Sequence, residues 1–523
     1  MRRIYATLAV LMLAVAAHAA THYVAQTAGV FSGGSACNGQ TAIAPATWNS
    51  TSESPGDISY VCGTVTGAAN TYVLGFAWSG SSGNPITLIF DTGAVLTSPV
   101  WSANGAINVY ALSNIVINGG TNGIIQNTAN GTGQTYSQQS VGVAVQGSGS
   151  NITVENLTIK NLCYRNAGDV GTACETSGNF SSDISVSTTM GGTFSNISIV
   201  GNTLSDSYAG VWLQGSASDA GILVQHNTIR TNNWGVATDG TNNLTIDGND
   251  VACVVGAVCN WDDSADDNHH DGLFVFPQSF AMKVIAVSNN WVHDFNGNTT
   301  ALYFNDPGGS GSSEDGTVFF NNIWSTTAGQ LGPANGDVLP PNNSIIVNNT
   351  FTGPTYALIN LESGVVFKNN ILTSPSDFVV NIDSVGSGDT FAYNDYYNTV
   401  NGWAHNGSAV SSTLSGWISG STALCSGGCD ATGSVLANPN LSSTFTLQSG
   451  SAAIGAGTNL TSLGITGLSQ GAPQYFGASY ACGTGCLSRP SSGAWDIGAY
   501  PNSGGGPSPP SAPGTAVLMM APL

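Results

Sequence analysis

The densest group of reactive side chains lies in one short stretch, Trp261–Asp271, which contains five aspartates and two adjacent histidines. Carboxylates this close repel one another unless a cation neutralises them. Clustered oxygen ligands suit Ca²⁺, although the spacing is not that of an EF-hand. We therefore predict a Ca²⁺ site; the alternatives are a solvated acidic loop and a transition-metal site of the His-His-Asp type. The predicted ligands are Asp262, Asp263, Asp266 and Asp267.

The two histidines of this stretch, His269 and His270, point in opposite directions if the chain is extended there. One imidazole then faces the neighbouring surface, where it can act as an acid or base near neutral pH. We take His270 as the first candidate for a catalytic base.

Cations are scarce, with 8 Lys+Arg against 29 Asp+Glu and a formal net charge of -21, so their positions are informative. This balance excludes nucleic acid as a partner, because phosphate backbones are bound by clustered Lys and Arg. Lys160, Arg165 and Arg230 fall at the same edge of nearby repeats, and His293 and Asp294 occupy the equivalent positions later. Arg230 is the second candidate base; pairing with neighbouring carboxylates is the alternative role of these cations.

The composition indicates a large globular chain of unusual surface. Charged residues make up 7% of the sequence, where about 25% is usual, and Gly is enriched at 68 residues. Hydrophobic residues still reach 41%, which provides for a sizeable core and argues against wholesale disorder. The glycines keep no three-residue period, so a collagen-like chain is excluded.

Residues 1–19 have the layout of a cleavable secretory signal. Arg2 and Arg3 precede an apolar run that ends in the small-x-small sequence Ala17-His18-Ala19. The run is shorter than the roughly 20 residues of a membrane span, and no later segment is long enough either. We therefore expect a secreted protein, extracellular or on the cell surface, without a transmembrane segment; the periplasm is the alternative.

The 10 cysteines agree with export, because they fall into near-neighbour pairs. Local disulfides that staple loops are the simplest account in an oxidising compartment. Zinc is the weaker alternative, since the spacings are not those of a zinc ribbon. The expected pairs are Cys37/Cys62, Cys163/Cys174, Cys253/Cys259, Cys425/Cys429 and Cys482/Cys486.

One template recurs along the chain, a β-rich segment that ends in Asn, at steps of about 20 to 40 residues. Such units with irregular insertions are typical of a parallel β-helix, whose rungs bury their apolar faces on one another. Stacked Asn amides hydrogen-bond along a column, and Asn tolerates the left-handed backbone of a tight bend. The predicted column is Asn202, Asn227, Asn249, Asn290, Asn322, Asn349 and Asn370, opened one residue early by Asn156 and continued by Asp395.

These repeats resemble the right-handed parallel β-helix proteins of the pectate-lyase-like superfamily over about residues 85–400. The later sequence Trp495-Asp-Ile-Gly-Ala-Tyr500 looks like the closing motif of secreted bacterial members. The resemblance implies an all-β solenoid with rungs of about 20–25 residues, an Asn ladder and long loop insertions. Residues 20–84 are then the N-terminal cap and first strands, 401–500 a β-rich and loop region that closes the helix, and 501–523 a Pro/Gly/Ser-rich linker and tail.

A second set of strands lies between the asparagines, and its period-two alternation predicts which side chains leave the core. The outward set combines aromatic and polar groups, which suit the faces and hydroxyls of sugar rings. Packing beneath long loops is the alternative. The expected inward residues are Val211, Leu213, Val236, Leu273, Val275, Leu302 and Phe304, and the expected outward ones are Trp212, Gln214, Asp239, Phe274, Phe276, Tyr303 and Asn305.

Two long insertions precede strands of this second set, at residues 161–182 and 252–270, and each contains a cysteine pair. Their rungs are expected to lie three apart, which is roughly 14 Å at a strand spacing of about 4.8 Å. Long loops on a rigid scaffold commonly carry function. We expect them to wall a cleft floored by Trp212, Gln214 and Asp239.

Three function classes follow, and the leading one is an enzyme that acts on an extracellular polysaccharide. A lyase needs a base for the C5 proton of a uronate and neutralisation of its carboxylate, which Arg230 or His270 with bound Ca²⁺ would supply. A glycoside hydrolase needs two carboxyl groups within about 5 to 10 Å, and Asp239 and Asp271 on adjacent rungs are the candidates. The Asn-Thr-Asp and Gly-His-Gly motifs of polygalacturonases are absent.

The third class is a surface glycan-binding or structural protein that keeps the scaffold without its chemistry. In every case the expected partner is a polysaccharide, and we expect a monomer. The residues assigned to substrate binding are Trp212, Gln214, Phe274, Tyr303 and Asn305.

Overall fold

The computed structural model of the 523-residue chain describes much of the sequence in segments. The described residues are 19–165, 174–176, 179–188, 192–231, 233–253, 271–276, 284–294, 296–304, 316–325, 328–330, 343–352, 364–373, 378–381, 389–397, 402–406, 408–411, 430, 432–463, 489 and 492–500.

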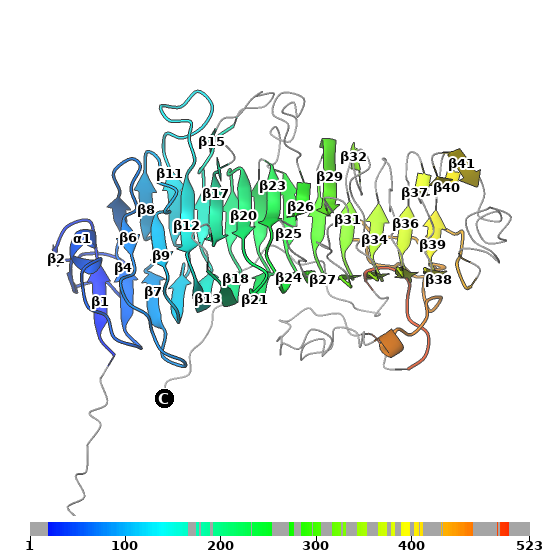
Figure 1. The fold of residues 1–523 in the computed structure, drawn as a ribbon, viewed down its shortest axis with the longest axis horizontal. Helices are drawn as coiled ribbons and strands as arrows, with labels where there is room; N and C mark the ends of the chain where they lie inside the picture. The colour runs from blue at the N-terminus through cyan, green and yellow to red at the C-terminus, as the bar shows by residue number, and fades with distance from the viewer. Residues whose placement is uncertain are drawn as a thin grey trace, which may run out of the picture.

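Most of the described strands belong to three long parallel sheets, in which successive turns of the chain lie side by side (Figure 1). Neighbours within a sheet are therefore one turn apart in the sequence. Ile197, for example, pairs with Ile152 on the turn before and with Ile222 on the turn after. This arrangement is a parallel β-helix, which confirms the all-β solenoid predicted from the repeats.

The first sheet contains the strands that end in the asparagine template: β1 (Thr21–Val24), β4 (Ile58–Val61), β7 (Ile86–Phe90), β10 (Ile115–Asn118), β13 (Gly149–Glu155), β18 (Phe194–Val200), β21 (Ala220–Gln225), β24 (Leu244–Asp247), β27 (Val284–Ser288), β30 (Val318–Phe320), β33 (Ile345–Val347), β35 (Val366–Lys368) and β38 (Thr390–Ala392). The second sheet follows the asparagines: β5 (Thr64–Thr66), β8 (Val95–Ser98), β11 (Ile124–Asn127), β14 (Thr158–Lys160), β19 (Thr203–Ser205), β22 (Thr228–Thr231), β25 (Asp250–Cys253), β28 (Trp291–His293), β31 (Ile323–Ser325), β34 (Thr350–Thr352), β36 (Ile371–Thr373) and β39 (Asp395–Tyr397).

The third sheet holds the predicted second strand set: β6 (Leu74–Gly75), β9 (Ile107–Tyr110), β12 (Val141–Gln146), β17 (Ser182–Ser187), β20 (Ala209–Gln214), β23 (Trp234–Asp239), β26 (Asp271–Phe276), β29 (Asn296–Phe304) and β32 (Ala328–Gln330). Shorter elements lie outside the three sheets: β2 (Gly29–Val30), β3 (Thr41–Ala42), α1 (Pro45–Trp48), β15 (Glu175–Thr176), β16 (Asn179–Phe180), β37 (Phe378–Asn381), β40 (Gly402–Asn406), β41 (Ser408–Ser411) and η3 (Thr461–Leu463). No helix among the described residues is long and apolar enough to cross a membrane.

Strand stacking begins at β1, so the helix starts well before residue 85, within the region predicted to hold the cap and first strands. Helix α1 lies at this end (Figure 1). Its Trp48 is 2% exposed and belongs to the main core, and the indole N–H donates to Ser59 Oγ at 2.8 Å. The predicted disulfide Cys37–Cys62 links the loop after β2 to the end of β4. Together these contacts cover the apolar interior where the stack begins.

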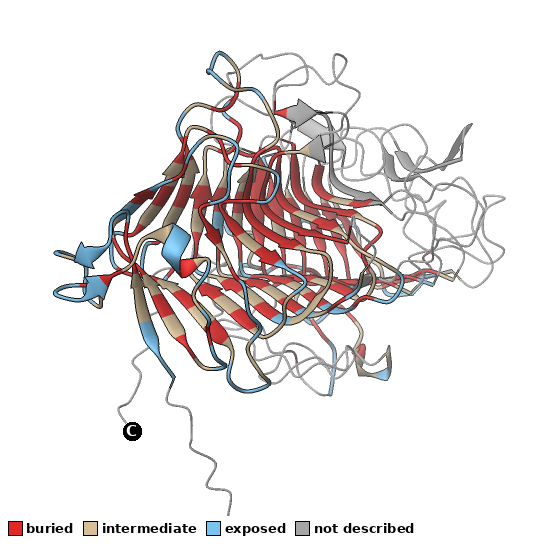
Figure 2. Ribbon diagram, turned by 60° about the vertical axis from the view of Figure 1, so that its left-hand side comes forward, coloured by how far each residue is buried: buried red, intermediate tan, exposed pale blue. Residues whose placement is uncertain are grey.

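Buried residues recur along the strands of all three sheets (Figure 2). The main core cluster between the sheets consists mostly of aliphatic residues. The inward residues predicted on the third sheet, Val211, Leu213, Val236, Leu273 and Val275, are all fully buried. Burying one such side chain contributes up to about 1.5–3 kcal/mol. The side chains of Leu302 and Phe304 lie outside the described residues. Continuous rows of these contacts fix the register from one turn to the next.

The predicted asparagine column is present as a ladder of buried hydrogen bonds. Asn249 Oδ1 accepts the backbone N–H of Asn227 at 3.0 Å and its Nδ2 at 2.9 Å. Asn249 Nδ2 donates onward to Asn290 Oδ1 at 3.0 Å and back to the Val224 carbonyl at 2.9 Å. The same pattern repeats along the column, so each amide is satisfied by its neighbouring turns. The members are Asn202, Asn227, Asn249, Asn290, Asn322, Asn349 and Asn370.

The structure corrects the predicted continuation at Asp395, and it places Asn156 one residue early, as predicted, but outside the ladder. The backbone N–H of Asn370 donates to Asn394 Oδ1 at 2.9 Å, so Asn394 continues the ladder, while Asp395 opens β39. At the other end, the N–H of Leu157 donates to Asn202 Oδ1 at 3.0 Å. Asn156, with φ 58°, therefore stands one place before the ladder.

The residue directly before each ladder residue adopts the left-handed backbone conformation of the bend. The ladder residue itself already leads into the next strand. The residues with positive φ directly before the ladder are Gly201, His226, Gly248, Asn289, Asn321, Asn348, Asn369 and Tyr393.

The C-terminal segment returns along the outside of this bend. Asn348 Nδ2 donates to the Asp496 carbonyl at 3.0 Å, and the N–H of Gly498 donates to the Asn369 carbonyl at 2.7 Å. Trp495 is 1% exposed and packs against outward side chains of the first sheet. Arg489 Nη2 binds Asn321 Oδ1 at 3.1 Å; burial lowers the pKa of Arg489 to about 9, so it stays charged at neutral pH. The predicted closing motif thus covers the side of the helix.

The ladder predicts a large stability loss for Asn249→Ala. The substitution leaves the backbone N–H of Asn227 and one N–H of its side-chain amide without their acceptor, Asn249 Oδ1, which should lower the free energy of unfolding by about 3 kcal/mol. Asn104→Ala, at an exposed Asn, is the matched control and should stay within about 0.5 kcal/mol. Thermal and urea unfolding followed by circular dichroism measure both. Equal stability of the two variants would contradict the ladder's energetic role.

Candidate functional site

The third sheet presents the outward side chains predicted to bind substrate. Trp212 pairs with Ser185 on the turn before and Ala237 on the turn after, and Ala237 pairs with Phe274. Trp212 and Phe274 are half-buried, whereas the alternate residues of their strands are fully buried. These two side chains therefore point out of the core. The backbone of Tyr303 pairs with Phe274 on the next turn.

Three rings form an aromatic layer on this face: Trp212, Trp234 and Phe274. Trp212 and Phe274 lie two turns apart with only the small Ala237 between them in their column, and Trp234 packs with Ala237 in the same cluster. The ring centroid of Trp234 lies 5.7 Å from Trp212 and 4.7 Å from Phe274, with interplanar angles of 16° and 9°. The rings thus stack along the helix axis.

The insertion before β17 packs against the aromatic layer and carries the predicted disulfide Cys163–Cys174. Its Phe180 meets Trp212 and Trp234 edge-on, with centroid distances of 5.5 and 4.9 Å. Trp234 is consequently only 4% exposed, while the two ends of the layer keep partial exposure. Packing beneath a loop accounts for the middle of the layer, while Trp212 and Phe274 at its ends stay partly exposed.

A polar row runs beside the aromatic layer at the ends of β17, β20 and β23. Ser187 Oγ donates to Gln214 Oε1 at 3.0 Å, and Gln214 Nε2 donates to Asp239 Oδ2 at 3.1 Å. Gln214 is thereby held from both sides, and both Gln214 and Asp239 are half-buried. An oriented amide and a carboxylate next to aromatic rings form a surface that can hydrogen-bond to hydroxyls and stack on apolar ring faces.

The structure does not bring Asp239 and Asp271 together. Asp239 pairs with Phe276, at the far end of β26 from Asp271. At a rise of about 3.3 Å per residue, the two positions lie about 17 Å apart along the strands. Asp271 is also fully buried. These two residues therefore do not form the pair, about 5 to 10 Å apart, that a glycoside hydrolase needs.

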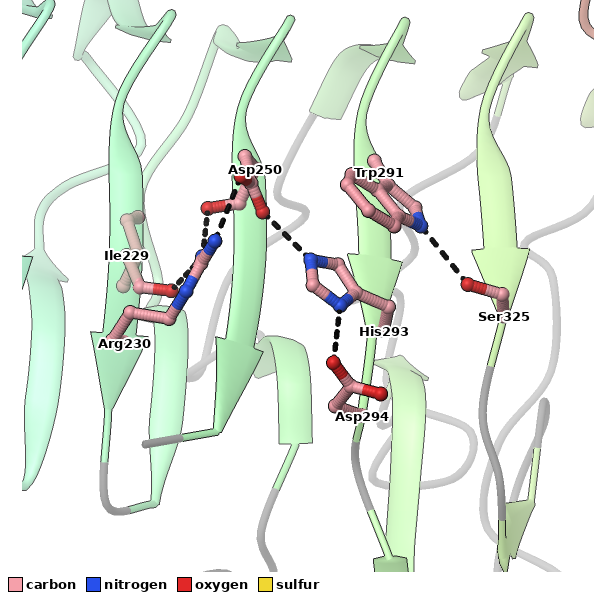
Figure 3. Close-up of polar contacts among 7 residues, drawn as sticks. All are labelled: Ile229, Arg230, Asp250, Trp291, His293, Asp294 and Ser325. Atoms are coloured by element: carbon pink, nitrogen blue, oxygen red, sulfur yellow. Dashed lines mark hydrogen bonds and ion pairs between the residues drawn. The ribbon is translucent and has the colours of Figure 1, made fainter. Parts of the chain in front are cut away.

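Arg230 lies in an ionic network on the outer side of the second sheet (Figure 3). Its Nη2 is 2.8 Å from Asp250 Oδ2, and its Nη1 donates to the Ile229 carbonyl at 2.9 Å. Asp250 Oδ1 is 2.8 Å from His293 Nε2, and His293 Nδ1 is 2.7 Å from Asp294 Oδ2. Asp250 thus joins the two basic groups.

The electrostatics of this network keep Asp250 ionised. Burial by itself would raise the pKa of Asp250, but hydrogen bonds from His293 and Arg230 outweigh it and hold the pKa below its ordinary value. His293 has a carboxylate oxygen at each ring nitrogen, so both contacts are hydrogen bonds only when both nitrogens carry a proton. A guanidinium paired with a buried carboxylate stays protonated, and Arg230 is accordingly a poor base.

The indole of Trp291 supports the network from one side. It stacks on His293 with a centroid distance of 3.8 Å and an interplanar angle of 18°. Its Nε1 donates to Ser325 Oγ at 2.9 Å (Figure 3). The imidazole is therefore held in one orientation by stacking and by two carboxylates.

The structure places the predicted cations Lys160, Arg230 and His293 in one column of the second sheet, linked through Ser205 and Ala252. Their common edge is therefore confirmed. Arg230 pairs with a neighbouring carboxylate, which is the alternative role stated above. Burial raises the pKa of Asp206, and the charge of Lys160 partly offsets that rise. Arg165 lies outside the column and is buried.

Several predicted site residues lie outside the described part of the chain. They are His270, Asn305 and the proposed Ca²⁺ ligands Asp262, Asp263, Asp266 and Asp267, together with the side chains of Phe276 and Tyr303. Cys253, at the start of the same insertion, is disulfide-bonded.

Sequence reasoning missed Trp234, Phe180 and Asp250. Asp250 directly follows the ladder residue Asn249, so the repeat template could have predicted its position at the start of a second-sheet strand. Trp234 stands where the preceding turn has Ala209, and strand alternation gives it the same inward parity as Val236, so the sequence did not indicate its place in the outer aromatic cluster. Phe180 gave no signal either, because it lies in an insertion with no counterpart on other turns.

No protein-family profile and no curated sequence matches the chain. Similar solved structures include the pectate lyase Pel9A, at 16% identity and a TM-score of 0.44, with 92% of this chain and 96% of that chain covered. A rhamnogalacturonan lyase has 15% identity and a TM-score of 0.42, covering 64% and 82%. PfbA, a surface adhesin of Streptococcus pneumoniae, has 11% identity and a TM-score of 0.37, covering 66% and 77%. Likeness at this level does not carry an activity from one chain to another.

The network predicts a pH-dependent stability loss for Asp250→Asn. Loss of the carboxylate leaves Arg230 and His293 without their shared counter-ion, which should cost about 2–3 kcal/mol at pH 7. Because the folded pKa lies below the unfolded value of about 3.9, the contribution of Asp250 is complete above that value and is lost as pH falls through the folded pKa. The gap between wild type and variant should therefore close in acid.

Urea unfolding between pH 3 and pH 7 measures this gap. Asp294→Asn is the control, because the side chain of Asp294 is 61% exposed and its ion pair should contribute no more than about 1 kcal/mol. A gap for Asp250→Asn that stays constant down to pH 3 would contradict the assigned electrostatics.

Proposed function

We propose that this protein binds an extracellular polysaccharide on the outer face of the third sheet and cleaves it by β-elimination at a uronate. The observation that carries the proposal is the aromatic layer, with half-exposed rings at Trp212 and Phe274 beside the oriented side chains of Gln214 and Asp239. Such rings accept the apolar faces of sugars, and the polar row accepts their hydroxyls. We assign Tyr303 and Asn305 to the same surface on the ground of the sequence alternation alone.

β-Elimination removes the C5 proton of the uronate and breaks the bond between C4 and its oxygen. The electron pair of the C–H bond forms the C4–C5 double bond, and the leaving oxygen takes up a proton. The step needs a base and positive charge near the carboxylate. We assign the neutralising role to Arg230, which its ion pair with Asp250 holds in place, and the base role to His270. Ca²⁺ at Asp262, Asp263, Asp266 and Asp267 would supply further positive charge.

Secretion fits this proposal. Two disulfides, Cys37–Cys62 and Cys163–Cys174, are present, and Cys253 is bonded as well. Structural disulfides are typical of proteins in oxidising compartments. A chain of net charge -21 repels an acidic polymer unless cations are present at the binding site. The column of Lys160, Arg230 and His293 on the second sheet would supply such cations.

A panel of acidic and neutral polysaccharides, with and without Ca²⁺, tests the activity. Absorbance at the wavelength of 4,5-unsaturated uronates reports elimination, and a reducing-end assay reports any cleavage. New reducing ends without unsaturated products would identify a hydrolase, whose carboxyl pair would have to be other than Asp239 and Asp271. Cleavage of no polymer would leave glycan binding as the function.

Non-catalytic glycan binding is the second candidate, and the network around Asp250 favours it. Arg230 and His293 make several contacts inside the protein, which is what a structural ion-pair network does. Affinity electrophoresis on gels that contain each polysaccharide separates the two candidates, because a binding protein is retarded without shortening the polymer.

Trp212→Ala and Phe274→Ala should weaken binding more than turnover. Removing one stacking ring should raise the Kd or KM about tenfold, with kcat changed much less, since the rings contact substrate and transition state alike. Tyr110→Ala is the control, because Tyr110 is an exposed ring on β9 of the same sheet and outside the aromatic layer. Unchanged affinity in both layer variants would remove this surface from the proposed function.

The proposed Ca²⁺ site predicts stabilisation by the ion. At a free concentration 100 times its Kd, a ligand that binds only the folded state adds about 2.7 kcal/mol. Scanning calorimetry should therefore show a higher Tm with millimolar Ca²⁺ than with EDTA. The variant Asp262→Asn/Asp263→Asn should abolish the difference. Identical melting of the wild type in both buffers would take Ca²⁺ out of the mechanism.

A further inference from the structure

The backbone of Ala20 makes two contacts at the first residue before β1. Its N–H donates to Asp57 Oδ1 at 2.7 Å, and its carbonyl accepts the N–H of Ile58 at 2.9 Å. Residue pairing then continues as Thr21 with Ile58 through β1 and β4. Ala20 is therefore the residue at which the chain joins the sheet.

The buried carboxylate of Asp57 accepts only a neutral amide N–H from Ala20, and a cation at that position would bind it more strongly. It is 3% exposed, and its second oxygen accepts the N–H of Ser54 at 2.7 Å. His22 Nε2 lies 3.8 Å from this second oxygen. Glu53 adds a like charge nearby, since burial and the field of Asp57 both raise the pKa of Glu53, to about 7. A buried carboxylate in this setting is stabilised by a close cation.

The sequence independently marks the same residue. The apolar run of residues 4–17 ends in Ala17-His18-Ala19, whose small residues predict cleavage after Ala19. Hydrolysis of the Ala19–Ala20 peptide bond adds the oxygen of water to the Ala19 carbonyl carbon, which leaves as a carboxylate, and frees the Ala20 nitrogen as an amine that is protonated to an α-ammonium group. The group keeps its position beside Asp57 Oδ1 and gains a unit charge and two hydrogens. Ala20 itself is exposed, so the cut leaves the ammonium in contact with water.

We propose that the chain is processed between Ala19 and Ala20 and that the new α-ammonium forms an ion pair with Asp57, which clamps the first strand of the β-helix. β1 is the edge strand of the first sheet. Terminal strands fray, and free edges invite pairing with other chains. The clamp exists only after processing, so the mature protein holds its edge more firmly than its precursor does.

The ion pair has a defined pH dependence. An α-amino group ordinarily has a pKa of about 7.7–8.0, and a nearby carboxylate raises it. A raised folded pKa gives stability that is complete below the unfolded value and is lost as pH rises through the folded value. The titratable groups that face the pair are His22 from β1 and Glu53 from the segment before β4. Burial raises the pKa of Glu53 to about 7, which is still below that of the α-amine. The loss above pH 8 therefore belongs to the α-amine.

Export of the full chain from a bacterial host, followed by intact mass and N-terminal sequencing, tests the processing. The expected first residue is Ala20; a mature chain that starts elsewhere overturns this part. The ion pair is tested on four proteins, namely the chain that starts at Ala20 and the chain with Gly-Ser added before Ala20, each with Asp57 and with Asp57→Asn.

The free ammonium should raise the Tm by about 2 °C at pH 7 in the Asp57 background only, and the advantage should vanish by about pH 10. Equal Tm values for the two Asp57 proteins, or the same advantage in the Asp57→Asn pair, overturn the ion pair. If Asp57→Asn does not fold, acetylation of the Ala20 amine replaces it, and an unchanged Tm after acetylation is then the contrary result.

Discussion

The structure depends on one constraint: a buried side-chain amide must find all its hydrogen bonds inside the protein. In the asparagine ladder most of those partners lie on neighbouring turns. Asn249 is satisfied by Asn227, Val224 and Asn290, and none of these is close in sequence. A slip of one residue on any turn would leave several buried groups without partners, so the ladder fixes the register of the whole stack and every outward column inherits that register.

The columns explain how much of the fold and site the sequence could predict. Val211, Leu213 and Val236 follow from strand alternation, and the ladder follows from its template. Its C-terminal end did not, because Phe391-Ala-Tyr-Asn-Asp395 offers two adjacent polar residues for one ladder place. The positive φ of Tyr393 decides between them by making Asn394 the first residue after the bend. A backbone angle of this kind has no signature in a single sequence when the residue is neither Gly nor Asn.

Packing across turns was the other limit. The aromatic layer needs the small Ala237 to admit the ring of Trp234, and it needs Phe180 from an insertion to cover that ring. Strand alternation predicts whether a side chain points into or out of the core. It does not predict which rings on different turns pack against each other. The hydrolase pair failed for a related reason, because adjacent rungs bring Asp239 close to Phe276 and leave Asp271 at the other end of the strand.

The ionic network of Arg230 and the aromatic layer lie on opposite sides of the turn that joins the second sheet to the third. Arg230 belongs to β22, four residues before Trp234 opens β23. One rung later in the sequence, residues 254–270 separate β25 from β26. The cation of Arg230 is held by Asp250, and the rings of Trp212, Trp234 and Phe274 stack on one another, so contacts among the described residues already orient both groups. Both groups belong to strands whose pairing follows the register that the ladder sets, so the charge and the aromatic layer keep a constant relation to each other from turn to turn.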